Sequence, residues 1–158
     1  MQRTLSLLVF VGLACGDLGE AADVAGAYTT NLTYGSNECN LDGWNEGNEL
    51  SAVPLTILQS GNAMEAEVGG GVGIYLDVVV GSRVFEGIVT GTFVDGTLRG
   101  ERRFNSAGCE FTVNGDLEVR VEGDFLSGEV RLRPSTDGGL GCSPFAGCIN
   151  RVTLNGAR

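Results

Sequence analysis

The sequence predicts an all-β fold, a single antiparallel up-and-down barrel or barrel-like meander of about eight or nine strands. Apolar and polar residues alternate over most of the chain, which is the pattern of half-buried strands. The 26 glycines stand among Val, Leu, Phe and Thr without a collagen-like period, as in short strands joined by tight turns. No long segment has the apolar spacing of an amphipathic helix.

The clearest strands form a long hairpin near the C-terminus. Every second residue of 109–121 is apolar, apart from Gly115, and the intervening residues are polar. Gly123 and Asp124 then turn the chain, and residues 126–132 alternate in the same way. We expect one face of this hairpin to be buried and the other to face solvent.

The remaining strands are expected to be joined mostly by short hairpins, with Asp95-Gly96 as a two-residue turn. In chain order they are residues 25–34, 53–57, 64–68, 72–80, 85–93, 98–104 and 149–156. Such a succession of strands can bury its apolar face by closing into a barrel. In strand number and Gly-rich turns, residues 25–156 resemble the small barrels of lipocalins and avidins, and this resemblance concerns the fold alone.

The N-terminus has the features of a bacterial export signal. Arg3 precedes a short apolar run that is far too short to span a bilayer core of about 30 Å. The sequence Gly12-Leu13-Ala14-Cys15 resembles the lipobox of bacterial lipoproteins, with Gly12 where Leu is usual. The resemblance implies that Cys15 carries acyl chains.

This interpretation divides the chain into three parts. Residues 1–14 are a lipoprotein signal peptide, residues 15–24 are the lipidated Cys and a short tether, and residues 25–158 are the β-barrel domain. The expected location is the bacterial cell envelope, where the lipid holds the protein to the outer membrane or to the outer face of a membrane. The alternative is ordinary cleavage after Ala21, which yields a periplasmic or secreted protein.

The cysteines predict two disulfides. If Cys15 is the anchor, four cysteines remain in an oxidising compartment, and three pairings can be drawn. We favour Cys142–Cys148, bridged by a turn at Pro144, together with Cys39–Cys109. A four-thiolate metal site is the competing interpretation, and the absence of a C-x-x-C pair disfavours it.

The segment 37–49 is rich in oxygen-bearing side chains and resembles an EF-hand calcium loop in its spacing, with Gly43 at the sixth place. The candidate calcium ligands are Glu38, Asn40, Asp42, Glu46 and Glu49. The alternative is a solvated polar loop held by a disulfide. No cofactor is expected, unless this segment binds calcium.

Trp44, the single Trp, lies in the same segment. It can cover one mouth of the barrel and pack there. It can instead be an anchor for a ligand or a protein partner, because Trp is favoured at binding hot spots.

Composition narrows the function. The net charge is −10, and the chain has no Lys and no His. A nucleic-acid partner is therefore not expected, and His- or Lys-based catalysis is excluded. We expect a non-catalytic binding module for a small apolar ligand or an envelope protein. The alternatives are a structural or envelope-interaction protein with a filled core, a calcium-binding loop module and, last, a carboxylate-pair hydrolase.

Overall fold

The computed structural model describes residues 20–41, 43–106 and 108–158. The all-β prediction is confirmed, because nine strands and two short helices make up the ordered elements of these residues. The elements are β1 (Gly26–Asn37), β2 (Glu49–Ser60), β3 (Ala63–Val68), α1 (Gly70–Val79), β4 (Val84–Thr90), β5 (Phe93–Leu98), β6 (Phe104–Ser106), β7 (Cys109–Glu122), β8 (Phe125–Thr136), the 3₁₀ helix η1 (Leu140–Phe145) and β9 (Asn150–Ala157).

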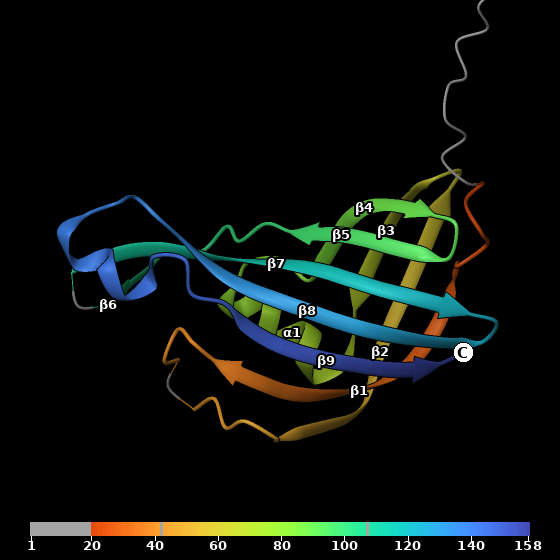
Figure 1. Cartoon of the computed structure of the whole chain (residues 1–158), viewed down its shortest axis with the longest axis horizontal. Helices are drawn as coiled ribbons and strands as arrows, with labels where there is room; N and C mark the ends of the chain where they lie inside the picture. Colours follow the sequence, from red (N-terminus) through yellow and green to blue (C-terminus); the bar gives the residue numbers. More distant parts are fainter. Residues whose placement is uncertain (1–19, 42, 107) are drawn as a thin grey trace, which may run out of the picture.

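Eight of the strands close into an antiparallel barrel (Figure 1). Strands β1 to β5 pair in chain order, β5 pairs with β7, and β7, β8 and β9 pair in order. The barrel is closed by β9 and β1, which place Leu32 opposite Leu154. The short strand β6 adds to the free length of β7. Closure leaves no sheet edge along most of the barrel for another chain to extend.

The inner face follows the alternation that the sequence predicts. On β7, Leu117, Val119 and Val121 are buried, and the residues between them point outward. Nearer the end of the barrel where β1 begins, Tyr28 and Ile57 are almost fully buried. This half of the interior is a packed hydrophobic core.

The two ends of the barrel differ. At one end the strands are joined by two-residue turns at 61–62, 91–92 and 123–124 (Figure 1). The N-terminal segment crosses this closed end: Val24 is fully buried, its N–H donates to Gln59 Oε1, and the Tyr28 hydroxyl donates to the Val24 carbonyl. The last residues of the predicted tether therefore belong to the barrel. The opposite end carries the long connections, α1, β6 and η1.

Residues 72–80, predicted as a strand, lie mostly in the helix α1, and that prediction is wrong. Helical hydrogen bonds run from Gly73 N to the Gly69 carbonyl and from Val80 N to the Leu76 carbonyl. The Val-rich run fits alternation, but Val72, Leu76 and Val80 are also spaced as one face of a helix. A short apolar run fits both the period of a strand and that of a helix, and this one forms a helix at the open end of the barrel.

The predicted turn at Asp95-Gly96 is also wrong. The chain turns at Gly91 and Thr92, and Gly96 lies inside β5 directly opposite Gly87 of β4. A Cβ on Gly87 would overlap the Asp95 carbonyl oxygen. Gly96 of the Asp-Gly pair therefore allows the backbones of β4 and β5 to approach closely, and it does not form a turn.

Both predicted disulfide pairings are wrong, although all four cysteines are bonded. The structure pairs Cys39 with Cys148 and Cys109 with Cys142, with Cα–Cα distances of 5.1 and 4.7 Å. Cys39 follows β1 and Cys148 precedes β9, so barrel closure brings them together. Cys142 lies in η1, which packs against the start of β7 at Cys109.

Candidate functional site

The interior of the barrel holds a cavity of about 490 Å³ on the side of the open end. All eight barrel strands contribute to its wall, together with α1, β6 and the loop after β1. The innermost lining residues of β1 and β2 are Thr30 and Leu55, because the next inward residues along these two strands, Tyr28 and Ile57, fill the barrel. The cavity is therefore a pocket with a floor.

Aromatic side chains form one side of the mouth. Tyr34 of β1 and Trp44 of the following loop stack with their ring centroids 4.6 Å apart and their planes at 19°. The Trp44 indole N–H donates to the Gly35 carbonyl at 2.9 Å, which holds the ring against β1. The structure thus places Trp44 at the cavity mouth, half-buried, in the position expected of a lid.

The helix α1 forms another side of the mouth. Its residues Val72, Leu76 and Val79 line the cavity, while Ile74 and Val78 are more than half exposed. The sequence analysis did not predict this wall, although the spacing of residues 72, 76 and 79 is that of one face of a helix.

Gly73 sets the distance between this helix and the barrel. It is buried, and a Cβ there would overlap the carbonyl oxygen of Val68 at the end of β3. Only a residue without a side chain permits this close approach.

A third part of the mouth is built on the Cys109–Cys142 bridge. Phe111 stacks between Phe104 and Phe145, with centroid distances of 5.5 and 4.6 Å. Phe104 and Phe111 line the cavity, and the buried disulfide packs in the same cluster. The bridge therefore attaches the η1 connection to the cavity wall.

The cavity is apolar in its chemistry. Among the described residues that line it, none is charged. The Thr30 hydroxyl inside the cavity donates to the Val53 carbonyl at 2.9 Å, so this polar atom already has a partner. Burial, with a smaller contribution from Tyr75, raises the pKa of Tyr34, and its phenol stays neutral at ordinary pH.

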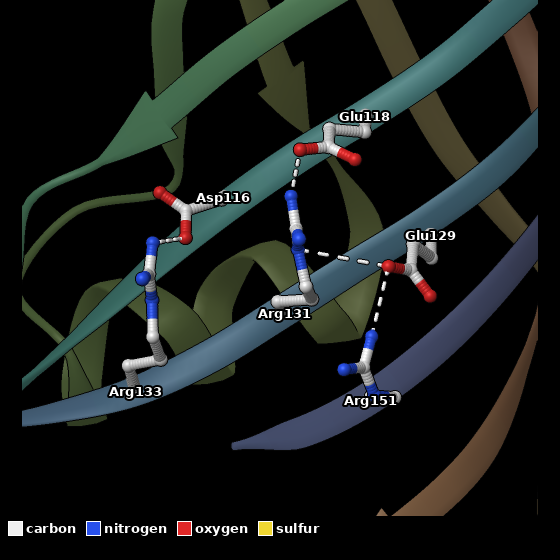
Figure 2. A network of polar contacts seen from close by, with 6 residues as sticks. All are labelled: Asp116, Glu118, Glu129, Arg131, Arg133 and Arg151. Carbon is white, nitrogen blue, oxygen red and sulfur yellow. Dashed lines mark hydrogen bonds and ion pairs between the residues drawn. The ribbon is translucent and has the colours of Figure 1, made fainter. Parts of the chain in front are cut away.

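A network of charged side chains lies instead on the outer face of β7, β8 and β9 (Figure 2). Arg131 contacts Glu118 and Glu129, and Glu129 also accepts from Arg151 at 3.0 Å. A second pair joins neighbouring strands in the same way, Arg133 with Asp116. Each of these carboxylates has an Arg partner, and none of them lines the cavity. The ion pairs of this network join residues of neighbouring strands on the same face of the sheet. The network therefore contains no pair of unpartnered carboxylates of the kind that a carboxylate-pair hydrolase uses.

The structure describes four of the five candidate calcium ligands. Glu38, Asn40 and Glu46 are exposed, and Glu49 is the first residue of β2. Asp42 lies outside the described residues. Within residues 20–41, 43–106 and 108–158, no group of three His, Cys, Asp or Glu side chains could hold a metal ion.

Amide groups hold this loop to the barrel instead. Asn150 at the start of β9 is fully buried; its Oδ1 accepts from Cys39 N at 3.0 Å and its Nδ2 donates to Asn37 Oδ1 at 2.8 Å. Asn37 Oδ1 also accepts from Leu41 N. Sequence reasoning gave Asn150 no role, because only barrel closure places it beside the loop.

Cys15, the predicted site of lipidation, lies outside the described residues, as does the predicted signal peptide. Of the helices in the described ranges, none has the length and apolar character needed to cross a membrane. The fold and the cavity define the class of the protein: a disulfide-linked, closed eight-stranded β-barrel with an internal apolar pocket. No protein-family model matches the chain, and neither does any curated protein or solved structure.

Proposed function

We propose that this protein is a non-catalytic binding module that holds a small apolar molecule in its barrel and is anchored to a bacterial membrane through Cys15. The cavity is the observation that carries the proposal. Its volume of about 490 Å³ lies within the range of about 300–1,000 Å³ that is usual for small-molecule sites. A liquid water molecule takes about 30 Å³, so the cavity has room for roughly sixteen non-hydrogen atoms.

The cavity favours binding over a purely structural role. Protein interiors are close-packed, and voids much larger than a water molecule are rare and costly. The closed half of this barrel is packed in that way, with Tyr28, Ile57 and Val94 almost fully buried. A filled-core protein gains nothing from leaving the other half hollow, whereas a ligand that fills it gains about 0.8 kcal/mol for each CH₂ removed from water.

The two disulfides and the position of the N-terminal segment support the proposed location. Disulfides persist in oxidising compartments, in agreement with export. Residues 20–24 lie at the closed end, so a lipid on Cys15 would be separated from the barrel by residues 16–19 alone, a reach of at most about 18 Å. The closed end would then face the membrane, and the mouth of the cavity would face away from it.

The binding proposal is tested with the chain exported to an oxidising periplasm as the Cys15→Ser variant. The neutral apolar dye N-phenyl-1-naphthylamine is titrated in, and energy transfer from Trp44, the single Trp at the mouth, reports its binding. We expect saturable binding at one site. Absence of saturable binding would overturn the proposal.

A matched pair of variants places the dye. Val152 points into the cavity and Thr153, its neighbour on β9, points to solvent. The Phe side chain has about four more carbon atoms than the Val side chain, which is about a quarter of the room in the cavity. Val152→Phe should weaken dye binding at least about tenfold, since a ligand excluded from part of the cavity loses about 0.8 kcal/mol for each CH₂ left outside. Thr153→Phe should bind as the parent does, and equal losses in both variants would contradict an internal site.

The anchoring proposal is tested separately by growing cells with an alkyne-labelled fatty acid. The wild-type chain should take up the label and sediment with membranes, and Cys15→Ser should do neither. Labelling that survives the Cys15→Ser change would overturn lipidation at this residue.

A further inference from the structure

We infer that the ligand of the barrel cavity is uncharged: a mainly hydrocarbon molecule that places up to about sixteen non-hydrogen atoms inside the cavity and its polar group at the aromatic mouth. The inference rests on the proposed binding function and adds the chemical class of the ligand. It follows from the partners that the cavity offers and from those that it lacks.

The cavity offers no counter-ion. None of the described lining residues carries a charge. Two of the lining side chains that have a polar group already use it, since Thr30 donates to the Val53 carbonyl and Trp44 donates to the Gly35 carbonyl. A carboxylate or ammonium group brought inside would lose its hydration and gain no partner in return. Such a transfer is strongly unfavourable, so charged groups in protein interiors are paired.

The net charge of the chain also disfavours an anionic ligand. The net charge is −10, and the Arg side chains of the β7–β9 outer face are engaged with carboxylates. The net negative charge therefore opposes the long-range approach of a fatty acid or another anion. A cation is attracted to the chain as a whole, but the lining gives it no carboxylate inside.

The mouth provides the place for a neutral polar group. Tyr34 and Tyr75 both line it, and their phenols can donate or accept a hydrogen bond. The raised pKa of Tyr34 keeps that phenol neutral. The floor at Thr30 and Leu55 is closed by packed side chains, so an elongated ligand enters with its apolar end first.

The test compares three molecules with the same twelve-carbon chain: dodecanol, dodecanoate and dodecyltrimethylammonium. Each displaces N-phenyl-1-naphthylamine from the Cys15→Ser chain at about pH 8, where the carboxylic acid is ionised. The series is repeated in about 1 M NaCl, where the Debye length is only about 3 Å, to separate the cavity from long-range charge. We expect dodecanol to bind at least about tenfold more tightly than either ion under both conditions.

The outcomes separate this inference from the proposed function. If the dye binds and either ion displaces it as well as dodecanol does, the binding function stands and the uncharged class is overturned. If the dye binds and dodecanol fails to displace it, the uncharged hydrocarbon class is overturned as well. If the dye does not bind, the proposed function falls and this inference falls with it.

A gain-of-function variant provides a second test. Leu132 of β8 lines the cavity, and Ser135 on the same strand is exposed. Leu132→Arg supplies the missing counter-ion and should improve dodecanoate binding at least about tenfold, while Ser135→Arg adds the same charge outside and should change it little. Near-ultraviolet circular dichroism confirms that each variant is folded. A folded Leu132→Arg chain with no gain for dodecanoate would contradict the argument.

Discussion

Removal of the Cys39–Cys148 bridge should destabilise the protein more than removal of Cys109–Cys142. The first bridge joins residues 109 positions apart and encloses the second, which spans 33. With the inner bridge present, the outer loop has an effective length of about 77 residues, and loop-closure entropy assigns it about 4.5 kcal/mol of stability. The same reasoning assigns about 3.8 kcal/mol to the inner bridge.

The measurement is urea unfolding of two double variants, Cys39→Ala with Cys148→Ala and Cys109→Ala with Cys142→Ala. Both should lose about 2–5 kcal/mol, the first more than the second. The wild type should be mapped beforehand under non-reducing conditions. Trypsin leaves Cys142 and Cys148 on one peptide because no Arg separates them, and chymotrypsin can cut between them after Phe145.

The decisive result is the connectivity. A peptide linking Cys142 directly to Cys148 would refute the barrel-closure argument, because β1 and β9 would then not need to bring Cys39 and Cys148 together. That short loop would also contribute only about 2.4 kcal/mol by the same entropy relation. An equal or reversed order of the two stability losses would show that native-state strain or residual denatured structure, and not loop length, dominates here.

Two further predictions concern the mouth and the closed end of the barrel. Gly73→Ala should destabilise the fold by about 1–3 kcal/mol in urea unfolding, because the added Cβ would overlap the Val68 carbonyl oxygen. Gly71→Ala on the same helix is the control: its Cβ would meet nothing within 4 Å, so it should be neutral or stabilising by up to about 1 kcal/mol. Equal effects of the two substitutions would contradict the close packing of α1. Burial raises the pKa of Tyr28, so the folded state holds the phenol proton more tightly than the unfolded state does. The stability that this provides is fully present below about pH 10 and is lost as the pH rises through the folded-state pKa. Tyr28→Phe should cost about 1 kcal/mol at neutral pH, for the lost hydrogen bond to Val24, and should reduce the fall in stability above about pH 10; an unchanged alkaline profile would show that Tyr28 does not cause it.

Much of the barrel was predictable because apolar and polar residues alternate along each strand, which shows which residues lie on the buried face. In residues 109–121 the buried positions fall on every second residue, apart from the half-buried Val113, because the side-chain period of a strand is two. Trp44 at the mouth was also among the predicted site residues, because a large aromatic residue in a polar loop invites a covering or binding role. The candidate calcium ligands rest on spacing alone, and because spacing in a loop does not determine which way each side chain points, the calcium site stays a prediction.

The sequence by itself determined the all-β class, the faces of its longest strands and the absence of His and Lys chemistry, since alternation and composition are local properties of the chain. Only the tertiary structure decided the pairing of β1 with β9, and with it the Cys39–Cys148 bridge and the role of Asn150. It also decided that the run around Leu76 is a helix at the mouth and that half of the barrel is hollow. These features depend on contacts between residues that are distant in the chain, and no local pattern encodes which distant strand, or how much empty space, an apolar face will meet.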